Sequence, residues 1–87
     1  MIYLTEKEVQ LINKNVPLVI GQRLREIRKN KNVSQTELAN LIGKDRQYIY
    51  KIEKGKVNTS ISTIGLISYA LQVDLSEIFK GIDLYKI

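Results

Sequence analysis

The sequence predicts an all-α fold: a five-helix domain over residues 17–79, a short N-terminal extension over 1–16 and a C-terminal tail over 80–87. Apolar residues recur three and four positions apart in several segments, which is the spacing of one helix face. Ser, Thr or Asp stands before most of these segments, where its side-chain oxygen can cap the first turn. Gly43 and Gly55 follow two of them, and glycine ends helices because it adopts left-handed backbone angles with little strain.

The N-terminal extension has a short helical pattern of its own. Thr5 and Glu8 are spaced as a capping box for a helix over about residues 6–14. Val16 and Pro17 indicate a join after it, because proline suits the first turn of a new helix. Such a short helix is marginal without tertiary support, and we expect the proline to separate it from the helix that follows.

The first helix of the domain is expected over about residues 18–31. Ile20, Leu24 and Ile27 repeat at helical spacing and predict the face that meets the core. Arg28 lies four residues after Leu24, so its charge falls beside this apolar face. A charge in that place needs a partner.

Residues 34–55 predict two short helices joined by a sharp turn. Ser34 and Glu37 form a capping box for the first of them, and Gly43 ends it. Asp45 is placed to cap the second helix. The apolar residues expected on the buried sides are Leu38, Ala39, Leu41, Ile42, Ile49 and Ile52.

The second of these short helices has two different faces. At about 100° per residue, Ile49 and Ile52 fall on one side. The polar residues on or beside the opposite side are Arg46, Gln47, Tyr48, Tyr50, Lys51 and Lys54. Guanidinium, amide, phenol and ammonium groups can bond base edges and phosphates, so this face is a candidate reader of nucleic acid.

This pattern resembles the helix-turn-helix of the lambda-repressor and Cro type, often called the Xre family. The residues at the fixed offsets of that motif are Gln35, Ala39, Gly43, Ile49 and Ile52. The resemblance covers about residues 18–79. It implies a lambda-repressor-like domain that binds double-stranded DNA as a homodimer, with no cofactor and no metal. It also implies a structural ion pair between Arg28 and Glu53.

The resemblance places the first turn of the second motif helix in the major groove. Arg46 can bond guanine there and Gln47 adenine, each in a bidentate way, and Lys51 lies one turn later on the same side. We expect Tyr50 at base edges and Tyr48 at the backbone, although either ring could pack on a thymine methyl or donate to phosphate. The predicted backbone contacts are Gln35, Lys44, Tyr48, Lys54, Lys56 and Asn58.

A later helix is expected over residues 61–71 behind a Ser60 cap. Its inner stripe comprises Ile61, Ile64, Ile67 and Leu71. Leu66 and Tyr69 fall on the outer face, which indicates that something covers it, and Gly65 indicates close approach by another backbone. Asp74 caps the last helix, over residues 75–79, and the alternating tail suits a short strand or a packed arm.

We expect the dimer contact on this apolar surface outside the motif. The predicted interface residues are Leu66, Tyr69, Phe79, Ile82, Leu84 and Tyr85, with Ile2, Tyr3 and Leu4 as candidates to add to them. Paired half-sites of this fold need a two-fold partner. The alternative is that the N-terminal extension covers this surface within one chain.

Charge and composition reduce the number of functions that the chain can have. The net charge is +5, and residues 18–57 hold ten basic and four acidic side chains, which indicates a polyanionic partner. The chain has no Cys and no His, so disulfides, thiol nucleophiles and imidazole bases are excluded and zinc sites disfavoured. No paired carboxylates stand out, and we predict that the protein is not an enzyme. We expect no membrane role and a cytoplasmic location.

The predicted function is a sequence-specific DNA-binding transcriptional regulator, in the simplest case a repressor. Small proteins of the Xre family also resemble antitoxins of toxin-antitoxin modules and restriction-modification controllers. An antitoxin would bind a protein partner such as a toxin as well as DNA. The sequence does not separate these alternatives.

Overall fold

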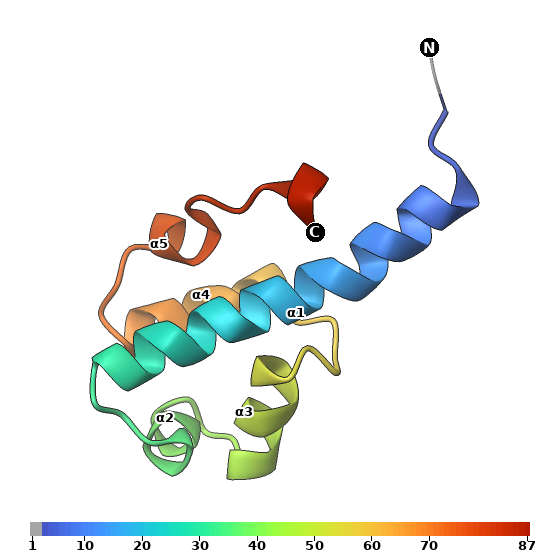
Figure 1. Ribbon diagram of the computed structural model, residues 1–87. Coiled ribbons are helices and arrows are strands. Elements are labelled where there is room, and N and C mark those ends of the chain that lie inside the picture. Colours follow the sequence, from blue (N-terminus) through green and yellow to red (C-terminus); the bar gives the residue numbers. More distant parts are fainter. Residues whose placement is uncertain (1–2) are drawn as a thin grey trace.

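The computed structural model describes residues 3–87 and confirms an all-α fold of five helices, with no strand in that range. The elements are α1 (Glu6–Asn30), α2 (Gln35–Leu41), α3 (Arg46–Glu53), α4 (Ile61–Ala70), α5 (Leu75–Phe79) and a 3₁₀ turn, η1 (Leu84–Lys86) (Figure 1). Over the same residues, no helix combines the length and apolar composition that crossing a bilayer requires.

The long helix α1 is the axis of the molecule. In Figure 1, α2 and α3 lie below it, α4 lies behind it, and α5 and the tail lie above it. The first turns of α1 extend beyond the other helices, so the molecule is elongated, with extents of 45 × 23 × 19 Å. This arrangement leaves α2 and α3 together at one side of the molecule.

One hydrophobic core joins all five helices. Each helix contributes one large side chain that is less than 2% exposed: Leu24, Leu38, Ile49, Ile67 and Ile78. A shared core of this kind fixes the helices relative to one another, because well-packed interiors tolerate little displacement.

The predicted helix caps are confirmed. The side chains of Thr5, Ser34, Asp45, Ser60 and Asp74 each accept a hydrogen bond from a backbone N–H in the first turn that follows. At two of these sites the bonds stabilise a carboxylate. The Ser34 backbone N–H, with its hydroxyl, lowers the pKa of Glu37, and the Ser76 backbone N–H and hydroxyl lower the pKa of Asp74.

The predicted break at Pro17 is wrong. Residues 6–30 form one helix with Pro17 inside it. Asn15, just before this point, donates its side-chain amide to the Leu11 carbonyl one turn back, at 2.9 Å. Val16 packs against the core on the other side, and such packing offsets the hydrogen bond that proline removes from a helix.

The structure corrects four smaller predictions. Leu41 is 63% exposed and Ile61 is 66% exposed, because each lies at an end of its helix beyond the edge of the core. Apart from its chain neighbours and the nearby backbone of α4, nothing among the described residues lies within 4 Å of the position that a Cβ would take at Gly65, so no other backbone approaches it closely. The tail forms a turn capped by Asp83, not a strand, since the described residues offer no sheet edge to pair with.

Candidate nucleic-acid interface

The unit formed by α2, the turn and α3 has the geometry that its sequence predicts. Gly43 has a φ of +70°, a backbone conformation that favours glycine, and it lets the chain reverse after α2. Asp45 Oδ1 accepts from the Tyr48 N–H at 2.9 Å and starts α3. Ile49 and Ile52 are buried against α1 and α2, so the opposite side of α3 is turned to solvent.

A buried ion network fixes the direction of α3. Arg28 Nε donates to Glu53 Oε2 at 2.6 Å, and Nη2 donates to Oε1 at 2.9 Å. The remaining amino group, Nη1, donates to the Val33 carbonyl at 2.7 Å. Both charged side chains are buried, and this pair is the one that the resemblance implied. The network joins the C-terminal ends of α1 and α3.

Gln35 belongs to the same network. Its side-chain Nε2 donates to Glu53 Oε1 at 3.0 Å, and the residue is half-buried at the start of α2. Glu53 therefore accepts from one of the two side-chain N–H groups of Gln35, the residue that we predicted to bind a phosphate. The phosphate contact of Gln35 stays a prediction, and it has one side-chain N–H left.

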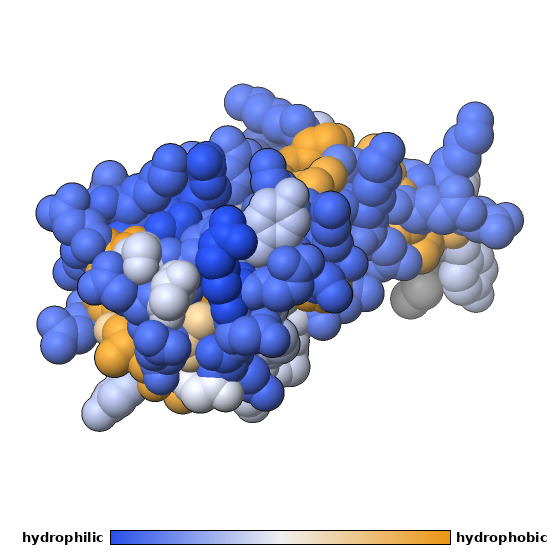
Figure 2. Space-filling view, turned by 90° about the horizontal axis from the view of Figure 1, so that it is seen from below, coloured by the Kyte–Doolittle hydropathy of each residue, from blue (hydrophilic) through white to orange (hydrophobic). Residues whose placement is uncertain are grey.

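The exposed face of α3 holds the predicted base readers. Arg46, Gln47 and Lys51 are exposed, and within residues 3–87 none of their side chains hydrogen-bonds to another protein group. Figure 2 looks onto the side of α2 and α3 and shows it mostly hydrophilic. Long polar side chains left unpaired on a fixed helix are available to a partner that supplies acceptors and donors.

Two tyrosine rings hold lysines at the two ends of α3. The Lys44 Nζ lies 5.2 Å from the centre of the Tyr48 ring, while Lys54 and Lys56 lie 5.9 and 5.4 Å from the Tyr50 ring. These are cation–π distances. Both rings are half-buried, so they position ammonium groups beside the exposed face. The base contact of Tyr50 and the backbone contact of Tyr48 stay predictions.

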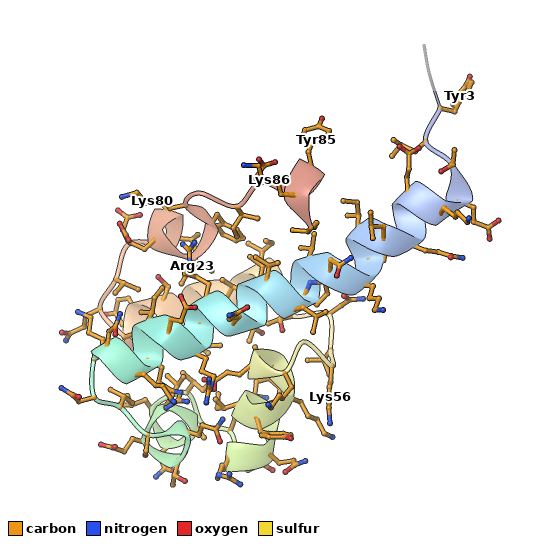
Figure 3. The ribbon with its side chains drawn as sticks, in the orientation of Figure 1. Tyr3, Arg23, Lys56, Lys80, Tyr85 and Lys86 are labelled. Carbon is orange, nitrogen blue, oxygen red and sulfur yellow. The ribbon has the colours of Figure 1, made fainter. Side chains whose placement is uncertain are left out.

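The remaining predicted backbone contact, Asn58, is exposed in the loop after α3. Lys56 points from the same loop toward the side of the molecule that holds α2 and α3 (Figure 3). The three lysines beside the rings are exposed as well. The structure therefore groups Lys44, Lys54, Lys56 and Asn58 around the ends of α3, and their contacts to phosphate stay predictions.

The predicted dimer residues are mostly exposed. Leu66, Tyr69, Phe79, Leu84 and Tyr85 are all exposed, whereas Ile82 is half-buried against the core. Tyr85 projects away from α1 (Figure 3). Tyr3 and Leu4 are exposed too, and Ile2 lies outside the described residues. Since α1 carries its first turns away from the bundle (Figure 1), they do not cover the outer face of α4.

Sequence reasoning missed the role of Arg23. Its Nη1 and Nη2 donate to the backbone carbonyls of Glu77 and Lys80, each at 2.7 Å, so the guanidinium bridges α1 and the C-terminal end of α5 (Figure 3). A cation there also interacts favourably with the carbonyl end of a helix. No sequence signal could have found this contact, because the acceptors are backbone groups far along the chain.

Comparison with known proteins agrees with this geometry. The HTH_3 family model, described as helix-turn-helix, matches residues 24–78. The control protein C.MunI from a Mycoplasma species is 37% identical over 70 residues, covering 79% of this chain and 95% of that protein. The immunity repressor of Bacillus phage phi105 is 34% identical over 61 residues, covering 70% of this chain and 42% of the repressor. The chain thus spans less than half of that repressor.

One solved structure matches this chain over most of that structure's length. The restriction-modification controller protein C.AhdI from Aeromonas hydrophila is 41% identical, with a TM-score of 0.69. The match covers 72% of this chain and 96% of that structure. The fold described above therefore recurs over nearly the whole of that solved structure.

Proposed function

Because the chain belongs to the HTH_3 family of helix-turn-helix transcriptional regulators, we propose that it binds specific duplex DNA sequences as a homodimer and represses transcription. One observation carries the proposal. Arg46, Gln47 and Lys51 stand unpaired on one exposed face of α3 within the described chain, and the buried Arg28–Glu53 pair holds that helix in place.

The chemistry of that face suits DNA better than a protein surface. A guanidinium and an amide can each make two hydrogen bonds to one base in the major groove. Lysines at both ends of α3 can bind the phosphates that border the groove. The net charge of +6 over residues 18–57 adds attraction for a polyanion over a longer range.

Two arguments support a homodimer: the two-fold symmetry of the DNA sites that this motif binds, and the exposed apolar side chains of this chain. A single reading helix contacts only a short stretch of sequence, and regulators with this motif pair two half-sites through a two-fold axis. The described surface outside the motif carries five exposed apolar or aromatic side chains: Leu66, Tyr69, Phe79, Leu84 and Tyr85. We assign the dimer contact to these residues, with Ile82 beneath them.

The relatives favour a restriction-modification controller as the kind of regulator. The match covers 95% of the control protein C.MunI and 96% of the C.AhdI structure, but only 42% of the phage repressor. The neighbouring genes distinguish the alternatives. A restriction endonuclease or methyltransferase gene beside this one supports a controller, and a toxin gene there supports an antitoxin.

Selection of bound sites from random duplex DNA tests the proposal. We expect an enriched site with two inverted half-sites, and binding that weakens steeply with salt because about five phosphates per subunit are neutralised. The measurement is the affinity for the enriched duplex at several salt concentrations. Absence of any enriched site, or an affinity independent of salt, would contradict the proposal.

A further inference from the structure

A groove lies between the N-terminal half of α1 and the loop after α3, outside the predicted reading face. From α1 it is lined by Asn13 and Lys14, and from the end of α3 and the loop by Lys54, Lys56 and Asn58. Its volume is about 430 Å³. Asn13 and Lys14 lie before the residues that the family model matches, so the family gives them no role.

At the floor of the groove, the backbone of the turn after α3 lies close to the backbone of α1. Gly55 has a φ of +68°, and a Cβ there would lie 2.7 Å from the Leu18 Cα. The turn after α3 therefore rests directly against Leu18 of α1. Lys14 lies about one helical turn before Leu18, and because α1 continues through Pro17, it is held beside the turn that carries Lys54 and Lys56.

The charge of the groove is of one sign. Three lysines and two asparagines are among its lining residues, together with Pro17, Leu18, Gly55 and Val57, and no acidic residue lines it. Glu53, which lies next to Lys54 in the chain, is buried and ion-paired with Arg28, so its charge does not face the groove. Neighbouring like charges repel one another, so an anion in the groove would relieve that repulsion and would find hydrogen-bond donors on both walls.

We propose that this groove binds the DNA phosphate backbone, and that Lys14 and Asn13 extend the contacts of Lys54, Lys56 and Asn58 along α1. The proposal rests on the proposed function and adds a second element to the same interface. DNA is favoured as the source of the phosphates because the groove continues from the C-terminal end of α3, the helix that carries the reading face.

The test compares Lys14→Gln with Lys7→Gln. Lys7 is an exposed lysine on the same helix and does not line the groove, so the two variants lose the same charge. Affinity is measured over a range of salt concentrations, for the duplex enriched by selection and for a scrambled duplex. We expect Lys14→Gln to lower affinity for both duplexes roughly three- to tenfold and to reduce the salt slope by about one per subunit, with Lys7→Gln near wild type.

Ethylation interference on the enriched duplex adds a positional readout. In wild type we expect a phosphate flanking each half-site whose ethylation blocks binding, and in Lys14→Gln that phosphate should lose its effect. Equal affinities and slopes for the two variants, with specific binding by wild type intact, would overturn the groove proposal alone. Failure of wild type to bind any duplex would overturn the proposed function and this inference together.

Discussion

Replacing Arg28 with Ala should strongly destabilise the protein. It leaves the Glu53 carboxylate buried with Gln35 as its remaining side-chain partner, and it leaves the Val33 carbonyl without its guanidinium donor. Breaking a buried ion pair from one side costs about 3–5 kcal/mol, against a total stability of about 5–15 kcal/mol for a domain. We therefore expect thermal unfolding at least about 12 °C lower than wild type.

Arg25→Ala is the matched control, because Arg25 lies exposed on the same helix and should change stability by less than about 0.5 kcal/mol. The double variant Arg28→Met, Glu53→Met should recover much of the loss, since it leaves no buried charge behind. Coincident melting curves for Arg28→Ala and Arg25→Ala would show that the pair does not stabilise the fold.

The second large effect should follow from charging the proposed dimer face. Leu66 and Leu84 are each 46% exposed, so Leu66→Lys, Leu84→Lys should leave the monomer folded and place like charges across the interface. Loss of the dimer removes the gain from binding two linked half-sites, and operator affinity should fall about 10²–10⁴-fold. Sedimentation at micromolar concentration should show a monomer.

Leu11→Lys supplies the control for this variant. Leu11 is 47% exposed on the part of α1 that extends beyond the bundle, and its replacement should leave the dimer intact. A doubly substituted protein that still sediments as a dimer would show that the contact lies elsewhere on the surface. Circular dichroism of both variants separates loss of the dimer from loss of the fold.

Local rules of sequence explain the features that could be predicted. A capping residue and its partner lie within three positions of each other, so Ser34 with Glu37 can be recognised from the chain alone. The exposed face of α3 follows from helical periodicity, which separates Ile49 and Ile52 from Gln47 and Lys51. The pairing of Arg28 with Glu53 came from the resemblance to a family, and the structure brings the two together.

The features that escaped prediction depend on contacts between distant segments. Nothing near Arg23 in the sequence indicates that it donates to carbonyls of α5. The local rule for proline predicted a break at Pro17, whereas packing of its neighbours keeps α1 continuous. The basic groove beside Lys14 exists only because that continuous helix crosses the turn after α3.

The central claim, that the exposed face of α3 reads base sequence, is tested most directly by comparing Gln47→Ala with Lys56→Ala. Affinity is measured for each variant on the selected operator and on scrambled DNA. Gln47→Ala should lose about 1–3 kcal/mol of preference for the operator and leave scrambled binding nearly unchanged. Lys56→Ala should weaken both by a similar factor and flatten the salt slope by about one. Equal weakening of both DNAs by Gln47→Ala would contradict the claim.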